Sequence, residues 1–199
     1  RDRLLPWLEA LGVAHLEAVI LSHPGVRPEA NWNFRQGPGI GTLVQASQCG
    51  QSRQFGLSRI ELDAWRDPRG TAVTRPEQSC NLVLGHGDFR AILFGPIRRS
   101  GERRLLQSLD EPVEVDLVLA PRGGAGRSSQ LGLIEALAPR WTILSPADWA
   151  PAPPAASRYS GAGTATLVTP RTGEVTVSLD RGSTRVTKAR SSSPWPAMP

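Results

Sequence analysis

The stretch from Glu114 to Ser129 constrains the fold of this chain more than any other part of the sequence. Its apolar segment Val115–Leu119 predicts a buried strand, because a short apolar run bounded by turn residues is typical of strands covered on both faces. A glycine-rich loop, PRGGAGRSS, leads into a predicted helix at Ser129–Leu137, and Trp141–Leu144 predicts the next strand. The order strand, helix, strand predicts parallel pairing inside an α/β domain.

The N-terminal region is predicted to contain one helix and one strand. Leu4, Leu8 and Leu11 share a face of the helix expected at Arg3–Leu11, and the apolar run Leu16–Leu21 predicts a mostly buried strand. Between residues 25 and 75 the periodicity is weak. This long segment therefore yields only two short strand candidates, Thr42–Ala46 and Ser58–Leu62.

A hairpin is predicted around Gly85–Asp88, because its glycines supply the positive φ of a tight reversal, and His86 is expected in the turn. Its strands are Cys80–Leu84 and Arg90–Phe94, and an amphipathic helix is expected at Glu102–Leu109. The proline-rich segment Pro146–Ala156 predicts a stiff, extended loop. A terminal hairpin is predicted from the strands Ala165–Val168 and Glu174–Leu179.

Length and composition are those of one globular domain. The chain has 199 residues, of which 39% are hydrophobic and 21% charged, enough for a single core. We expect this domain to span residues 1–190, with a disordered tail at residues 191–199. Because no apolar run approaches the roughly 18 to 20 residues that cross a bilayer, the sequence by itself predicts a soluble domain.

The charge balance is basic, with a formal net charge of +5 and a pI near 10.4. A basic protein favours polyanionic partners such as nucleic acid or anionic lipid. However, Lys188 is the only lysine among 23 basic residues, and such an arginine bias is equally well explained by a GC-rich genome. Both explanations remain open at the level of sequence.

Two groups of residues are candidates for binding phosphate. Arg122, Arg127, Ser128 and Ser129 lie in the glycine-rich loop ahead of a helix, where backbone N–H groups and arginines bind anions. Arg98, Arg99, Arg103 and Arg104 bracket the start of another helix and could form a stripe that contacts a DNA backbone. The alternatives are a collapsed loop and an ordinary solvated helix face. Neither a Walker ending nor a Rossmann spacing is present, so a nucleotide site has little support.

The two cysteines do not indicate a metal site. Cys49 and Cys80 form no Cys-x-x-Cys pair and have no cluster of histidines nearby. They are compatible with two buried thiols or with one disulfide, so the redox compartment stays undetermined.

Several stretches resemble, in the same order, the C-terminal metallo-β-lactamase-like domain of ComEC-type competence proteins. They are LLPWLEALGVAHLEAVILSH at 4–23, SCNLVL at 79–84, RAILFGPI at 90–97, GERRLLQSL at 101–109, VDLVLAPRGGAGRSS at 115–129, LIEALAPRWTIL at 133–144 and RTGEVTVSL at 171–179. The resemblance implies a metallo-β-lactamase-like αββα sandwich, two mixed sheets with outer helices. The family's opening strands do not precede Arg1, which implies a domain incomplete at its N-terminus.

The family's metal ligands are mostly replaced in this sequence. His23 stands at the first histidine of the Ser-His-Pro-Asp-x-Asp-His motif, but Gly25, Arg27 and Pro28 replace the ligands that follow it. Pro96 stands at the bridging aspartate, and Arg122 and Gly123 stand at a pair of histidines. His23 is therefore expected to be a relic of the motif, and we predict no catalytic residues, no metal and no cofactor.

The resemblance implies a place in bacterial DNA uptake. We expect a non-catalytic domain, attached to the inner membrane on its extracytoplasmic side, that scaffolds the membrane channel domain of the same or a partner chain or contacts incoming DNA. No small-molecule substrate is expected. The alternative is a metal-dependent hydrolase or nuclease that holds zinc or manganese with relocated ligands, for which the candidates are Glu29, Asp88, Glu102 and Asp148.

Overall fold

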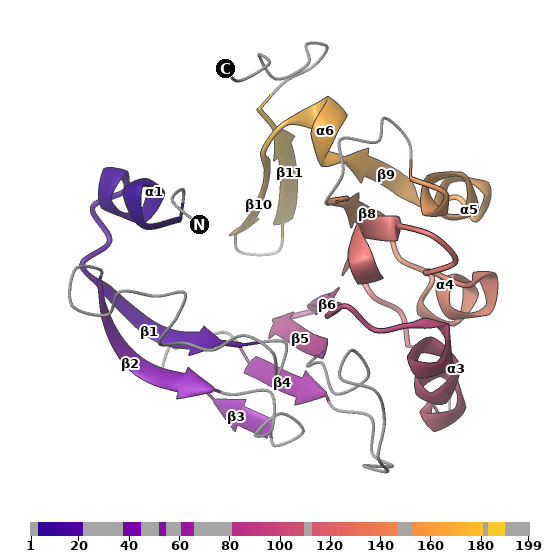
Figure 1. Ribbon diagram of the computed structural model, residues 1–199, viewed down its shortest axis with the longest axis horizontal. Coiled ribbons are helices and arrows are strands. Elements are labelled where there is room, and N and C mark those ends of the chain that lie inside the picture. Colours follow the sequence, from indigo (N-terminus) through magenta and orange to yellow (C-terminus); the bar gives the residue numbers. More distant parts are fainter. Residues whose placement is uncertain are drawn as a thin grey trace.

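The largest element of the fold is a mixed sheet of seven strands (Figure 1). A computed structural model describes residues 4–21, 38–44, 52–54, 61–65, 81–109, 113–146, 153–180 and 183–189. In the large sheet the strands follow the order β3-β4-β5-β6-β7-β8-β9. Two smaller pairs accompany it, β1 with β2 and β10 with β11.

The large sheet has an antiparallel half and a parallel half. Strands β3 (Ser52–Gln54), β4 (Glu61–Trp65), β5 (Asn81–His86) and β6 (Phe89–Leu93) pair antiparallel. Strands β6, β7 (Leu117–Leu119), β8 (Trp141–Leu144) and β9 (Ala165–Val168) pair in parallel. Since β7 and β8 are joined by helix α4 (Leu131–Leu137), the predicted strand–helix–strand unit is confirmed.

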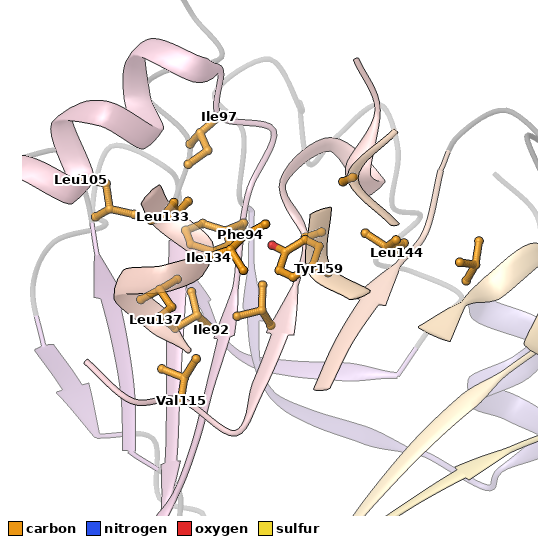
Figure 2. Close-up of a cluster of buried hydrophobic side chains, with 14 residues drawn as sticks. Ile92, Phe94, Ile97, Leu105, Val115, Leu133, Ile134, Leu137, Leu144 and Tyr159 are labelled. Atoms are coloured by element: carbon orange, nitrogen blue, oxygen red, sulfur yellow. The ribbon is translucent and has the colours of Figure 1, made fainter. Parts of the chain in front are cut away.

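Three helices cover one face of the sheet. They are α3 (Arg99–Ser108), α4 and α5 (Ala155–Gly161), which lie along the same side of the large sheet in Figure 1. Figure 2 shows the core between these layers, where Ile92 and Leu144 from the strands meet Leu133, Ile134 and Tyr159 from the helices. The buried face of α4 is apolar because its leucine and isoleucine residues recur at helical spacing.

The opposite face of the sheet packs against the hairpin of β10 (Val175–Asp180) and β11 (Ser183–Lys188). Phe89, Ala91 and Leu117 form the sheet side of this second core, and Val177 and Leu179 pack onto it from β10. Both faces of β6 are thus buried, as expected of a strand between two layers. Helices, sheet and hairpin form successive layers, and the predicted mixed α/β class is confirmed.

The N-terminal part contains α1 (Leu4–Ala10), β1 (His15–Ile20) and β2 (Gly39–Val44), with β1 and β2 parallel. β2 begins at Gly39, three residues before the predicted Thr42, and its glycines lie close to β1. A Cβ on Gly41 would lie 2.8 Å from the carbonyl oxygen of Glu17 and 3.3 Å from Nε2 of His15. The glycines thus let the His15 ring lie against the neighbouring backbone.

The predicted terminal hairpin is wrong. β9 pairs in parallel with β8, the short helix α6 (Thr169–Thr172) follows it, and β10 pairs with β11 instead of β9. The physical reason lies in burial, since Leu167 and Val168 are both buried on opposite faces of β9. A strand buried on both faces fits the inside of a layered α/β fold better than a terminal hairpin does.

The proline-rich segment also differs from its prediction. Within its described part, α5 begins at Ala155, directly after Pro153 and Pro154, so this end of the segment is helical and not extended. Prolines are tolerated ahead of a first helical turn because no intrahelical bond needs their N–H groups. The predicted turn position of His86 is also shifted, because β5 runs through His86 and the reversal occurs at Gly87, with φ of 57°.

Some predictions fall on residues outside the described ranges. These are the tail at residues 191–199, Cys49 and Cys80, and His23. Among the helices of the described part of the chain, none is long and apolar enough to cross a membrane.

Candidate nucleic-acid interface

The carboxyl ends of the four parallel strands β6 to β9 meet at one edge of the sheet. Backbone bonds tie them together there, from the N–H of Phe94 to the oxygen of Leu119 (3.1 Å) and from the N–H of Ala120 to the oxygen of Ile143 (3.0 Å). The hydroxyl of Thr169 after β9 donates to that of Ser145 after β8, at 3.3 Å. In open α/β sheets this edge is where ligands bind.

Exposed arginines gather at this edge. The segments that follow the four strands are residues 94–99, 120–130, 145–146 and 169–173, and none of these described residues is Asp or Glu. Their exposed arginines, which we call the basic edge, are Arg98, Arg99, Arg122, Arg127 and Arg171. The predicted candidates Arg98, Arg99, Arg122 and Arg127 are therefore brought to one edge of the fold, and Arg171 joins them.

The loop after β7 is a closely packed turn. It begins with the short 3-10 segment η3 (Pro121–Gly124). A Cβ on Gly123 would lie 2.1 Å from the carbonyl oxygen of Ser145, and one on Gly124 would lie 2.7 Å from a methyl group of Leu144. Both glycines are thus required where the loop presses against the end of β8.

Arg122 occupies the left-handed region of backbone space, with φ of 52° and ψ of 29°. This conformation costs a residue with a Cβ about 1 to 2 kcal/mol, and such strain persists where the surroundings hold it. The side chain of Arg122 is exposed, so the strained backbone presents the guanidinium to solvent. A second exposed guanidinium follows at the turn that contains Arg127.

Glu102 holds the far end of this loop. Its side chain is fully buried, and its two carboxylate oxygens accept hydrogen bonds from the backbone N–H groups of Ser129 (2.7 Å) and Gln130 (2.9 Å). These N–H groups open helix α4, whose N-cap residue Gln130 makes no side-chain capping bond of its own. A carboxylate from α3 therefore caps α4 across the helix interface.

Arg158 holds the same peptide groups from the other side. Its Nε donates to the carbonyl oxygen of Ser129 at 2.9 Å, and its Nη2 donates to that of Ser128. The side chains of Glu102 and Arg158 thus form hydrogen bonds with the N–H groups and the carbonyl groups, respectively, of residues 128–130. Charge-assisted bonds of this kind are stronger than those between neutral groups.

Tyr159 lies beneath this stretch and is buried. Burial raises the pKa of its phenol, and the nearby Glu102 carboxylate adds to this, whereas Ser129, Thr142 and Arg158 lower it. The phenol therefore stays protonated at neutral pH and packs as a neutral group in the core of Figure 2.

The serines of the loop lie inside the protein. Ser128 is 3% exposed and donates its hydroxyl to the oxygen of Ala125 at 2.8 Å, while Ser129 is 0% exposed. Within the described chain, Ser129 Oγ makes no hydrogen bond of standard geometry, although the Tyr159 phenol is near enough to interact with it. Because Ser128 and Ser129 are buried, we expect no direct phosphate contact from their hydroxyl groups, and the exposed arginines remain the candidates for that contact.

Arg99 links the two helices that flank the loop. Its Nε donates to Oε1 of Gln130 at 2.9 Å, and its carbonyl oxygen accepts from Nε2 of Gln130 at 2.9 Å. The start of α3 is thus tied to the start of α4. Arg98 and Arg99 are thereby kept beside the loop that carries Arg122 and Arg127.

The described residues do not fit the metal centre that the family resemblance implies. Among them, no group of three or more His, Cys, Asp and Glu side chains could hold a metal ion. Of the relocated ligand candidates, Glu102 is used by backbone N–H groups, and Asp88 lies in the turn before β6, at the opposite end of the strand. His23, Glu29 and Asp148 lie outside the described ranges.

Comparison with known proteins yields structural matches of low identity. No protein-family model matches the chain, and no curated protein matches it in sequence. One matching structure is a protein from Thermotoga maritima described as a zinc-dependent hydrolase of the metallo-β-lactamase superfamily, with 10% identity and a TM-score of 0.36, covering 65% of this chain and 57% of that one. Another is a mutant of the β-hydroxylase CmlA, with 9% identity and a TM-score of 0.46, covering 78% of this chain and 43% of that one. This chain thus spans about half the length of these two proteins.

Sequence reasoning overlooked Arg171, Arg158 and the capping role of Glu102. To place Arg171 at the basic edge, one must know that β9 pairs in parallel with β8, because that pairing brings α6 to this edge. The contacts of Arg158 span 29 and 30 residues, and those of Glu102 span 27 and 28. No periodic pattern in the sequence signals contacts over such separations.

Proposed function

We propose that this chain is a non-catalytic, metallo-β-lactamase-like domain of a ComEC-type DNA-uptake protein, and that it contacts DNA through the basic edge. The observation that carries the proposal is the collection of exposed arginines in the segments that follow four parallel strands, where the described residues 94–99, 120–130, 145–146 and 169–173 include no Asp or Glu. The ordered sequence resemblance to the ComEC-type domain supplies the biological setting.

Arginine suits this role for a physical reason. Its planar guanidinium stays charged at all relevant pH values and can form two parallel hydrogen bonds with one phosphate. Contacts with phosphates also release counterions, so affinity falls steeply with salt, by about 0.9 logarithmic units per contact for duplex DNA and about 0.7 for single strands. An edge built from several arginines therefore favours a chain of phosphates over an isolated anion.

The absence of catalysis is supported by the residues at the family's ligand positions. Arg122 and Gly123 stand where a pair of histidines would bind metal, and Arg122 places a cation at the same edge of the sheet. A fixed positive charge disfavours a divalent cation next to it. By the same resemblance, we place the domain beside a membrane channel domain of the same or a partner chain, on the extracytoplasmic side of the inner membrane.

The experiment is a salt titration of DNA affinity with a charge-matched control. Fluorescence anisotropy would measure binding of labelled single-stranded and duplex oligonucleotides to the intact chain and to two double variants. Arg122→Gln with Arg127→Gln removes two charges from the basic edge, whereas Arg90→Gln with Arg140→Gln removes two exposed charges from the opposite end of the strands. We expect only the first pair to weaken binding and to flatten the salt dependence, by about 1.4 to 1.8 logarithmic units.

Two outcomes would contradict the proposal. Equal losses in both double variants would mean that net charge, and not the basic edge, governs binding. Metal-dependent cleavage of the oligonucleotides, with zinc or manganese bound in stoichiometric amount, would replace the proposal with the hydrolase that uses relocated ligands.

A further inference from the structure

The loop that carries Arg122 and Arg127 has an unusual backbone. Between Pro121 and Gln130, positive φ angles occur at Arg122, Gly123, Gly124, Gly126 and Ser129. A free segment rich in glycine samples many conformations, and holding it in one of them has an entropic cost. Something outside the loop must therefore hold it in its observed shape.

The two side chains that grip the loop come from different helices. Glu102 on α3 accepts hydrogen bonds from the N–H groups of Ser129 and Gln130, at 2.7 and 2.9 Å. Arg158 on α5 donates to the carbonyl oxygens of Ser128 and Ser129. The three consecutive residues 128–130 are thus held by an anion and a cation from opposite sides.

Neither side chain is placed to contact DNA itself. Glu102 is fully buried and negatively charged when ionised, and Arg158 is only partly exposed with its Nε and Nη2 already engaged. Both act on backbone groups one to three residues beyond Arg127. Their effect on DNA must therefore pass through the position of the loop.

We propose that Glu102 and Arg158 are positioning residues that preorganise Arg122 and Arg127 for contact with phosphates. This inference rests on the proposed function, because it assigns a purpose to the loop geometry in DNA binding. A loop that is ordered before binding loses less conformational entropy on association, so affinity gains without any added contact. Weakening the hydrogen bonds of Glu102 and Arg158 to the loop should therefore lower DNA affinity, although no DNA contact is removed.

The test uses Glu102→Gln and Arg158→Lys in the full chain. Glutamine keeps the size of Glu102 but turns one acceptor into a donor that faces an N–H group, and lysine cannot donate from two fixed nitrogens to both carbonyl groups. In each variant we expect faster amide hydrogen exchange over residues 122–130. We also expect about tenfold weaker DNA binding, because a tenfold change in affinity corresponds to roughly the entropic cost of fixing the backbone of one residue. Glu135→Gln, an exposed position on α4, is the control and should change neither quantity.

A background without the two arginines of the loop separates positioning from a general loss of stability. In the chain with Arg122→Gln and Arg127→Gln, adding Glu102→Gln or Arg158→Lys should weaken the remaining binding less than twofold. A full tenfold loss in that background would overturn the inference, and so would unchanged affinity in a folded variant whose loop exchanges rapidly. If Glu102→Gln prevents folding, Arg158→Lys alone decides between these results.

The failure of the proposed function looks different. If the wild-type chain shows no salt-dependent DNA binding, the basic edge is not a DNA site, and the inference falls with it. If the wild-type chain binds and loses affinity with Arg122→Gln and Arg127→Gln, but not with Glu102→Gln or Arg158→Lys, only the positioning role is overturned.

Discussion

The two ends of the parallel strands β6 to β9 carry charges of opposite sign. The segments at the carboxyl ends hold the five arginines of the basic edge and no described acidic residue. The segments at the amino ends, residues 87–88, 113–116, 138–140 and 162–164, hold Asp88, Glu114 and Asp116 with Arg140, and Arg90 follows at the start of β6. Among these, Asp116 accepts the N–H of Arg90 at 2.9 Å, and Arg140 stacks on Trp141 at 4.2 Å.

Net charge alone therefore describes the protein poorly. A surplus of +5 spread evenly would attract polyanions from any side. Because the strand directions collect the arginines at one end, a phosphate chain meets attraction at the carboxyl edge and acidic groups at the amino edge. The comparison therefore predicts an orientation for bound DNA as well as an affinity.

The largest expected effect compares a packed glycine with an open one. Gly123→Ala at the carboxyl edge combines a positive φ of 61° with a Cβ only 2.1 Å from a backbone oxygen, so the free energy of unfolding should fall by about 2 to 5 kcal/mol. Gly163→Ala at the amino edge has a φ of 83° but nothing within 4 Å, and should lose only about 1 to 2 kcal/mol. Urea denaturation measures both, and equal losses would contradict the tight packing of the loop.

Removing four arginines from the basic edge should have the next largest effect. In the variant with Arg98, Arg99, Arg122 and Arg127 all changed to Gln, we expect DNA affinity at low salt to fall about 100-fold or more. Changing Asp88 to Asn and Glu114 to Gln at the amino edge raises the net charge by two, yet should alter affinity little. Anisotropy titrations would show a large gain in the acidic-edge variant if overall charge were the cause.

Arg122→Gly separates the charge of this residue from its backbone strain. Glycine adopts a φ of 52° without the penalty that arginine carries, so stability should stay equal or rise by about 1 kcal/mol. DNA affinity should nevertheless fall about fivefold, because one phosphate contact is lost. Thermal unfolding and anisotropy on the same sample would test this, and a clear loss of stability would contradict the left-handed conformation of Arg122.

Arg171→Gln tests how far the basic edge extends along the sheet. Arg171 lies on α6 after β9, the last strand of the order, so a DNA strand centred on the β7 loop would reach it last. We expect about a twofold to threefold loss of affinity and a reduction of the salt slope by less than one contact. A loss as large as that of Arg127→Gln would move the centre of the binding edge towards β9.

The smallest effect at neutral pH concerns Tyr159, which is the only tyrosine in the chain. Burial raises the pKa of its phenol above the ordinary value of 10.0, so the unfolded chain releases this proton at lower pH than the folded chain does. Stability is therefore unaffected below about pH 10 and falls as the pH rises from 10 towards the higher folded value. Absorbance at 295 nm would follow the phenol directly.

The control for this prediction is Tyr159→Phe, which should remove the part of the alkaline loss that the phenol causes. A midpoint of the native absorbance titration at or below 10 would contradict the buried environment of Tyr159. It would also question the closeness of the phenol to Glu102 and Ser129.

A large part of the fold could be read from local patterns. The apolar runs at β7 and β8 and the periodic residues of α4 predicted the parallel unit. The glycines around residue 86 predicted the β5–β6 hairpin, although His86 belongs to the strand and not to the turn. These signals are local, since they depend on side-chain alternation and on backbone preferences within about ten residues. The β9 pairing failed because strand partners are chosen by burial across the whole fold.

The candidate site divides in the same way. That arginines follow two predicted strands, and that glycines fill the loop between β7 and α4, can be read from the order of residues along the chain. The burial of Ser128 and Ser129, the place of Arg171 in the basic edge, and the hydrogen bonds of Glu102 and Arg158 to the loop became visible in the folded chain alone. The physical reason is that burial, partner choice and hydrogen bonding between helices depend on segments that meet only after the chain has folded.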